Sequence, residues 1–171
     1  MALNVEFTFD EKTYRHYMNG FLSVMHCHHY MSLLTNLAIN YDDMGGIKIL
    51  TESAEDTIRP LFDDYYQKNN LGTTEEKLGV GPGYYSVMGM GLMKADGNEQ
   101  GGQVVLSRSH VDQGWLKKWD NPGRPVNYWT CGYISAMFAA AFGKPARSYE
   151  VTEVKSMVKG DETSLFEIKL K

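Results

Sequence analysis

The last third of the chain has the clearest pattern of hydrophobic and polar positions. Between Pro125 and Gly143 nearly every residue is apolar or small, and Pro145 follows closely. Glycine just past the last helical residue, with proline soon after, is a common helix stop. A helix with so little polar surface must be covered on several sides. We therefore predict one central, buried helix in this stretch.

The residues after this helix alternate in the manner of strands. Near the C-terminus Phe166, Ile168 and Leu170 alternate with Glu167 and Lys169, which predicts a strand with one buried and one solvated face. A second strand precedes it from about residue 149. The segment 159–161, Lys-Gly-Asp, is a glycine-containing turn that joins the two.

The N-terminal half reads as one strand followed by helices. Residues 3–9 alternate as a half-buried strand, and Asp10 stands where it can cap a long helix to about residue 40. Apolar positions at three- and four-residue steps support that helix, with a bend at Gly20. A second helix is predicted over residues 51–70, which Pro60 either kinks or begins. Thr73 or Thr74 caps a short third helix that ends at Leu78.

Glycine dominates the middle of the chain, from residue 79 to residue 102. Its Gly-Val-Gly-Pro-Gly run lacks the preceding strand and the following Lys-Ser/Thr of a phosphate-binding loop, so we predict a loop that leads into a hairpin. The hairpin strands cover 88–94 and 103–108, with a turn at 96–98. Ser109 is expected to cap a helix from Val111 to Trp119.

This order of elements favours an α+β fold. Runs of helices and hairpins, without strict alternation, indicate a mainly antiparallel sheet. At 171 residues, with no linker or repeat, we expect a single domain over residues 1–171.

Composition indicates which classes of binding partner and which cellular compartment to expect. The net charge is −4 and no run of Lys or Arg exceeds two, which argues against nucleic acid or an anionic membrane as a partner. Two cysteines cannot form a disulfide framework, so free thiols are expected. The N-terminus shows no signal-peptide pattern. We expect a cytoplasmic protein.

The C-terminal stretch resembles the end of the 4-vinyl reductase (small hydrocarbon-binding) domain. That domain is also the sensory part of phenol- and xylene-responsive transcription activators. The matching positions are Pro125-Val126, Gly132-Tyr133, Ser135, Gly143-Lys144, Glu153, Gly160-Asp161 and Phe166. The resemblance implies helices on one face of a twisted sheet with a ligand cavity between them. It also implies a homodimer, as is common in this family and in the similar TRAPP-complex subunits.

One departure from the family pattern concerns metal. The resembling sensors hold a zinc ion with cysteines at three positions where this chain has Asn127, Ser156 and Ser164. Hydroxyl and amide groups do not replace thiolate ligands well. The resemblance therefore implies the fold and a pocket but no family-type zinc site, and it leaves any cofactor unknown.

The segment His26-Cys27-His28-His29-Tyr30 is the unusual chemical feature of the sequence. It contains three of the five histidines. On a helix His26 shares a face with His29 and Tyr30, while Cys27 points elsewhere. These histidines are either core or solvated side chains, or they belong to a site.

Three functional hypotheses remain open for them. In the first, His26 and His29 supply two imidazole ligands for a metal, and His110, Cys131 or a carboxylate from elsewhere in the chain completes the site. Alternatively Cys27 or Cys131 is a nucleophile activated by His28 or His29, as in a hydrolase or a reductase-like enzyme. In the third hypothesis the histidines give an apolar cavity a few polar contacts.

The leading functional prediction is the binding or sensing of a small, mostly apolar or aromatic molecule. Its expected contacts are His26, His29, Tyr30, Trp129, Cys131 and Tyr133. Aromatic side chains usually belong to the core but can also wall an apolar site. A sensor of this kind would signal through a separate partner.

Overall fold

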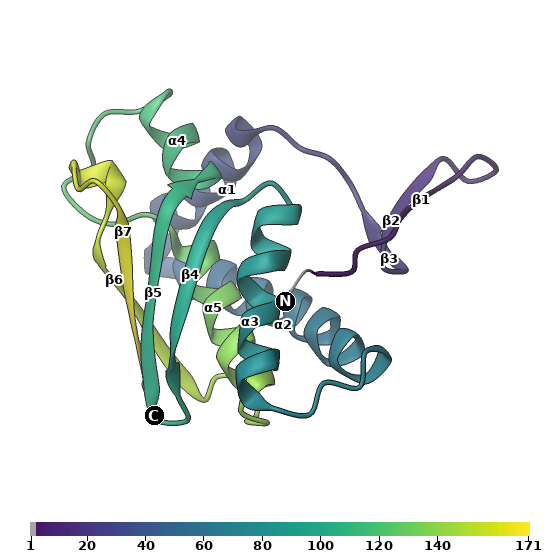
Figure 1. Cartoon of the computed structure of the whole chain (residues 1–171). Helices are drawn as coiled ribbons and strands as arrows, with labels where there is room; N and C mark the ends of the chain where they lie inside the picture. The colour runs from purple at the N-terminus through teal and green to yellow at the C-terminus, as the bar shows by residue number, and fades with distance from the viewer. Residues whose placement is uncertain (1–2) are drawn as a thin grey trace.

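A computed structural model describes residues 3–171 and shows an antiparallel sheet with helices packed on one face, which confirms the predicted α+β class (Figure 1). The main sheet has the strand order β4-β5-β7-β6. Its strands are β4 (Gly91–Asn98), β5 (Gly101–Ser109), β6 (Tyr149–Lys155) and β7 (Ser164–Leu170). A separate three-stranded sheet contains β1 (Phe7–Asp10), β2 (Arg15–Met18) and β3 (Phe21–Ser23).

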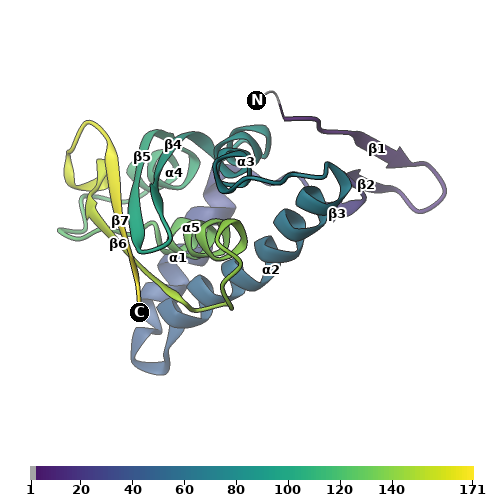
Figure 2. The same cartoon turned by 60° about the horizontal axis from the view of Figure 1, so that its bottom comes forward.

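The helices stack behind the main sheet. They are α1 (His28–Asn40), α2 (Gly46–Lys68), α3 (Thr74–Val87), α4 (His110–Leu116) and α5 (Tyr128–Ala141), with short 3-10 helices η1 (Asp42–Met44) and η2 (Met157–Lys159). Helix α5 lies between the sheet and α2, and α3 lies beside it along β4 (Figure 2). None of the helices in residues 3–171 combines the length and the apolar character needed to cross a membrane.

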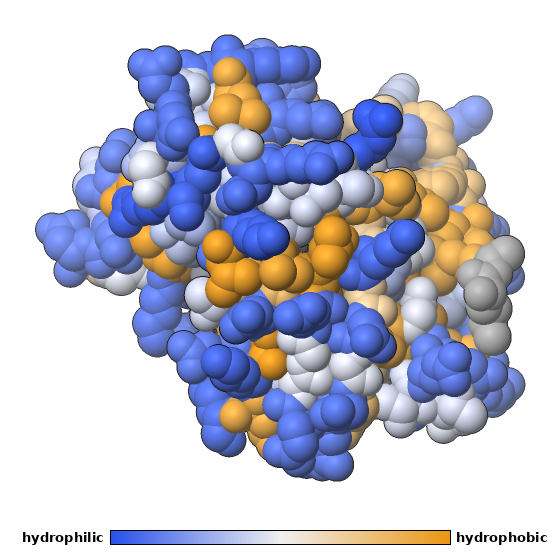
Figure 3. Space-filling model, turned by 60° about the vertical axis from the view of Figure 1, so that its left-hand side comes forward, coloured by the Kyte–Doolittle hydropathy of each residue, from blue (hydrophilic) through white to orange (hydrophobic). Residues whose placement is uncertain are grey.

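Helix α5 is the buried helix that the sequence predicted. All of its residues from Thr130 to Ala141 are buried, and Gly143 ends it with a φ of 64°. In the sheet Phe166 and Ile168 of β7 face the core beside Val104 and Leu106 of β5, as their alternation predicts. The opposite side of the sheet is mixed, with apolar patches on a mainly hydrophilic surface (Figure 3).

The long N-terminal helix predicted for residues 10–40 is wrong in its first half. Residues 7–23 form the strands β1, β2 and β3, which project from the body as an arm, and α1 begins only at His28 (Figure 1). We call residues 7–23 the N-terminal arm. At its base Met18 is buried, and the side-chain amide of Asn19 donates a hydrogen bond to the hydroxyl of Tyr84.

Two local turns explain this error. The Asp10 carboxylate accepts hydrogen bonds from the backbone N–H groups of Lys12 and Thr13, so it closes a turn instead of capping a helix. Asn19 and Gly20 have φ angles of 51° and 85° and connect β2 to β3. Asn-Gly with both residues at positive φ is the favoured two-residue hairpin turn, and that signal outweighs the helical spacing of the apolar residues.

The loop predicted for residues 79–87 is also wrong, because α3 continues through it. The predicted cap at Thr73 is confirmed as a reciprocal capping box with Glu76. Helix α3 then runs through Gly79, Gly81, Pro82 and Gly83 to Val87. A Cβ at Gly81 would collide with the Met137 side chain of α5, so this glycine permits close helix packing.

Other boundaries shift by a few residues. Helix α2 begins at Gly46, before the predicted residue 51, and it continues through Pro60. Strand β4 ends at Asn98 and strand β5 begins at Gly101. The hairpin turn therefore lies after the predicted residues 96–98. Helix α4 starts after Ser109, whose Oγ accepts from the N–H of Asp112 at 3.2 Å, which confirms the predicted cap. Between β6 and β7, η2 precedes Gly160.

Candidate ligand-binding cleft and buried polar cluster

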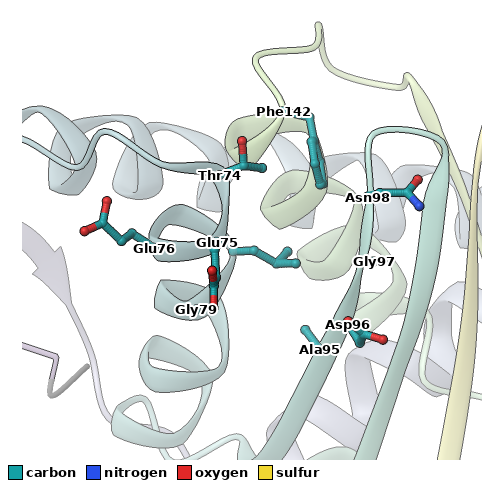
Figure 4. Close-up of a pocket in the computed structure, with 10 residues that line it drawn as sticks. Thr74, Glu75, Glu76, Gly79, Ala95, Asp96, Gly97, Asn98 and Phe142 are labelled. Carbon is teal, nitrogen blue, oxygen red and sulfur yellow. The ribbon is translucent and has the colours of Figure 1, made fainter.

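A cleft of about 780 Å³ opens between the N-terminal half of α3 and the β4–β5 hairpin. We call it the α3–β4 cleft. Phe142, directly after α5, points between α3 and the hairpin at its inner end (Figure 4). The cleft is lined by Thr74, Glu75, Glu76, Leu78, Gly79, Ala95, Asp96, Gly97, Asn98 and Phe142.

The lining combines apolar and acidic side chains. Leu78, Ala95 and Phe142 pack against the main core and give the cleft an apolar floor. Glu75 and Asp96 line the same cleft, whereas the carboxylate of Glu76 is held by the N–H of Thr73 at 3.0 Å. Such a surface suits a small apolar molecule that carries no negative charge, because an anion would face like charges.

Aromatic side chains fill the core next to α3 and α5. Tyr133 is fully buried, and its hydroxyl donates to the carbonyl of Gly81 at 2.7 Å. Its ring lies 5.7 Å from that of Trp129 and 5.1 Å from that of Tyr85. The Tyr85 hydroxyl pairs with Thr130 Oγ1 at 2.9 Å. Of the predicted contact residues, Trp129 and Tyr133 therefore lie together in the core.

Cys131 lies on the other side of α5, facing α2. It is buried and lines a smaller pocket of about 260 Å³ with Ser135, Glu55 and Arg147. Burial, with the nearby Glu153 and Asp112 carboxyls, raises the pKa of the Cys131 thiol well above its usual range. The thiol is therefore uncharged at neutral pH, and a protonated thiol is a poor nucleophile.

The histidine segment lies at the beginning of α1 and is not part of the α3–β4 cleft. Cys27 is exposed at the N-cap of α1, and His26, His29 and Tyr30 are also exposed. The His110 ring at the start of α4 lies 5.6 Å from that of His26 and 5.9 Å from that of His28. Thus the fold brings His110 to His26 and His28, while the ring of His29 lies 4.3 Å from that of His28 at an interplanar angle of 46°.

Desolvation lowers the pKa of both His28 and His110, so their rings favour the neutral form. The Nε2 atoms of both rings are buried without a hydrogen-bond partner. Over residues 3–171, no group of three or more His, Cys, Asp or Glu side chains has an arrangement that could hold a metal ion. The metal hypothesis for His26, His29 and His110 and the nucleophile hypothesis for Cys27 with His28 or His29 stay predictions.

The positions that carry cysteines in the resembling sensors come together in a buried polar cluster. We define this polar cluster as Ser109, Asp112, Asn127, Glu153, Ser156 and Ser164, all of them buried. It joins α4, the start of α5, and the strands β6 and β7.

Asn127 and Ser164 connect the two acids of this cluster. The backbone N–H of Asn127 donates to Glu153 Oε2 at 3.2 Å, and its side-chain Nδ2 donates to Ser109 Oγ at 3.1 Å and to Asp112 Oδ2 at 3.4 Å. Ser164 Oγ donates to the same Asp112 oxygen at 3.2 Å and accepts from the N–H of Met157. Asn127, the residue directly before α5, thus contacts both carboxyl groups.

The electrostatics of the polar cluster are unusual. Burial raises the pKa of Asp112 to about 6. Burial, and then the neighbouring Asp112, raises the pKa of Glu153 to about 7. Both acids thus stay protonated to a higher pH than acids in water do.

The donor set of the polar cluster does not fit zinc. One amide and two hydroxyls, those of Asn127, Ser156 and Ser164, stand where the resembling sensors have thiolates, and neither group is an ordinary zinc ligand. The two carboxyls that remain, Asp112 and Glu153, are fewer than the three protein ligands of a zinc site. We therefore derive no zinc chemistry for this protein.

The sequence did not indicate the two features that the fold assembles. The sequence did not predict the cleft residues Leu78, Ala95 and Phe142. The glycines in residues 79–87 indicate a loop, and without a helix there the sequence gives no reason to expect α3 beside β4. In the sequence Asp112 stands three residues after the predicted Ser109 cap, as an acidic residue in the first turn of a helix often does. Its distance from Glu153 in the sequence conceals their proximity.

Comparison with known proteins supports the fold. No protein-family model and no curated protein matches the chain. The phenol-responsive sensory domain of the transcription activator PoxR, solved with phenol, matches with a TM-score of 0.79 at 13% identity over 96% of this chain and 84% of that one. A vinyl-4-reductase family protein from Methanocaldococcus jannaschii matches with a TM-score of 0.55 at 16% identity over 87% and 84%.

A third solved structure extends the comparison. Trafficking protein particle complex subunit 3 from Naegleria fowleri, covalently bound to palmitic acid, matches with a TM-score of 0.53 at 13% identity over 81% of this chain and 95% of that one. The resemblance found in the sequence is therefore confirmed at the level of the fold. This chain is built like the phenol-sensing and vinyl-4-reductase domains.

Proposed function

We propose that this protein binds and senses a small, mostly apolar or aromatic molecule in the α3–β4 cleft. The observation that carries the proposal is the cleft itself, which combines a volume of about 780 Å³ with an apolar floor at Leu78, Ala95 and Phe142. Sites for small molecules are typically concave, largely apolar and of this size. The fold shared with a phenol-responsive sensory domain is consistent with this use.

The charges of the cleft restrict its ligand. Glu75 and Asp96 bring negative charge to the lining, and the lining contains no Lys, Arg or His. We therefore expect neutral aromatics, such as phenol or a methylphenol, to bind in preference to benzoate, which has a similar ring and a negative charge. The lining also contains no cysteine, so the cleft supports binding rather than the enzyme hypothesis.

Substitution at Gly79 tests the cleft directly. Gly79 lines it from α3, and a Cβ added there would meet no atom within 4 Å. Gly79→Phe should therefore fill the cleft without disturbing the core and abolish phenol binding in isothermal titration calorimetry. Gly79→Ala is the matched control, because one methyl group leaves most of the volume free, and it should bind phenol as the wild type does.

Two results would count against the proposal. One is phenol affinity that is equal in the wild type and in Gly79→Phe. The other is preference for benzoate over phenol, because it would require positive charge that the cleft lining does not contain.

We also infer that the protein acts as a homodimer and passes its signal to a separate partner. The N-terminal arm supports the dimer, because its outer strands β1 and β3 each pair with only β2. Phe7 and Leu22 of the arm are each 65% exposed. Unpaired strand edges with exposed apolar side chains are surfaces that a second chain can cover.

A further inference from the structure

We propose that Glu153 keeps its proton up to near-neutral pH, and that this proton takes the place of a metal ion in joining α4, α5, β6 and β7. The proposal concerns the polar cluster, which is separate from the α3–β4 cleft and independent of what binds there. It follows from three properties of the cluster: its charge, its count of hydrogen-bond donors, and the unequal contacts of its two acids.

The charge of the cluster cannot be balanced by a basic side chain. Asp112 is fully buried and Glu153 is 7% exposed. Neither acid makes a salt bridge within residues 3–171. Two negative charges at one buried place, without a cation, are strongly unfavourable, and one carboxyl keeps its proton instead.

The cluster has more unpaired hydrogen-bond acceptors than donors. Four buried oxygen atoms of the cluster have no partner, namely Asp112 Oδ1, Asn127 Oδ1, Glu153 Oε1 and Ser156 Oγ. Ionised carboxylates and amide oxygens can only accept, so most of this group cannot be satisfied internally. A proton on one carboxyl supplies a donor among these acceptors and removes one charge at the same time.

The contacts of the two acids decide which one is protonated. Asp112 accepts hydrogen bonds from Asn127 Nδ2 and Ser164 Oγ, and it lies in the first turn of α4, where negative charge is favoured. Glu153 accepts a well-formed hydrogen bond from the N–H of Asn127, and the hydroxyls of Ser156 and Ser164 lie close to its carboxyl group. The anion is therefore better supported at Asp112, and the proton belongs on Glu153.

The other titratable groups around the cluster are tyrosines, a cysteine and an aspartate, none of which is a cation. Tyr85 approaches from α3, and Tyr128 and Cys131 belong to α5; burial raises the pKa of each. On the β6–β7 connection, Asp161 accepts from the N–H of Ser156 at 2.8 Å and is exposed. These groups add no positive charge that would let both acids ionise.

The proposal predicts a definite pH dependence. The pKa of Glu153 is raised from 4.5 to about 7 by folding, so the native state binds the proton more tightly than the unfolded chain does. The corresponding stability is fully present below pH 4.5 and is lost as the pH rises through about 7. Each pH unit in that window lowers the folding equilibrium constant up to about tenfold.

The Glu153→Gln variant tests this in thermal unfolding between pH 5 and pH 8. Glutamine has the shape of a protonated glutamic acid, keeps an oxygen for the N–H of Asn127, and cannot ionise. We expect the excess of its unfolding midpoint over that of the wild type to be smallest at pH 5, to grow up to about pH 7, and to stay constant from there to pH 8. Glu150→Gln on the exposed side of the same strand is the control and should show no such trend.

Infrared spectroscopy provides an independent measurement, and its result for the wild type alone tests the proposal even if the variant does not fold. A protonated carboxyl has a carbonyl band distinct from that of a carboxylate, and this band should be present at pH 7, remain in Glu150→Gln and disappear in Glu153→Gln. Absence of the band in the wild type would overturn the proposal. So would a stoichiometric cation in native mass spectrometry, or a fall in the unfolding midpoint upon chelation.

Discussion

Burial gives the two cysteines of this protein opposite properties. Cys27 is exposed at the first residue before α1, and Cys131 is buried in α5. The sequence around the cysteines did not predict this difference. It placed Cys27 in the middle of a long helix, but the Asn19-Gly20 turn interrupts that helix and leaves Cys27 at the beginning of α1. At the residue scale the sequence identified the chemically unusual side chains, but their environment depended on turns and on packing between distant elements.

We predict that iodoacetamide modifies Cys27 in the native protein at neutral pH, while Cys131 reacts only after unfolding. The reagent can reach Cys27 because that side chain is exposed. It cannot reach the buried Cys131, whose raised pKa also keeps the thiol protonated and unreactive. Peptide mass spectrometry on native and denatured samples measures both sites at once. Equal labelling of the two cysteines in the native protein would contradict the burial of Cys131 on α5.

Helices α2, α3 and α5 owe their close packing to glycines whose roles differ. The sequence predicted α5 correctly because its apolar character is continuous, and it predicted β7 because alternation is unambiguous there. It failed for the second half of α3, where glycine and proline suggest a loop. Tertiary packing overrides that local preference, since Val80, Tyr84 and Tyr85 of α3 join the core.

The contrast between Gly132 and Gly79 gives a prediction at this scale. A Cβ at Gly132 would collide with the Thr51 carbonyl oxygen and approach the Ala54 Cβ to 2.8 Å, whereas at Gly79 it meets nothing within 4 Å. Gly132→Ala should therefore destabilise the protein by about 1–3 kcal/mol through overpacking. Gly79→Ala should stabilise it by about 0.5–1 kcal/mol, because alanine favours the helix.

Urea denaturation of the two variants beside the wild type measures both effects. A Gly132→Ala variant as stable as the wild type would show that α2 and α5 do not approach each other as closely as the structure indicates.

The whole molecule combines a closed body with a projecting arm. The α+β class and the sheet with helices on one face agree with the resemblance found in the C-terminal third. The arm could not be predicted in the same way, because its short strands bury little of their own surface and Phe7 and Leu22 remain exposed. Short strands of this kind are stabilised more by packing against another surface than by the contacts among themselves.

We predict that the arm holds a homodimer together. The double variant Phe7→Lys/Leu22→Lys places charge on the exposed apolar surface of the arm and should convert a dimer into a monomer of 19.4 kDa. Ile49→Lys, at an exposed position of α2, is the control and should remain dimeric. Sedimentation equilibrium distinguishes these states. A monomeric wild type at micromolar concentration, or a dimeric double variant, would contradict this role for the arm.

The central claim is that the α3–β4 cleft receives a small neutral aromatic molecule, and a phenol titration followed by two-dimensional NMR of backbone amides tests it most directly. We expect saturable shifts to concentrate on Leu78, Gly79, Ala95, Gly97 and Phe142, and to be absent in Gly79→Phe. Shifts confined to the histidines at the beginning of α1 and α4, or no saturable shifts at all, would contradict the claim.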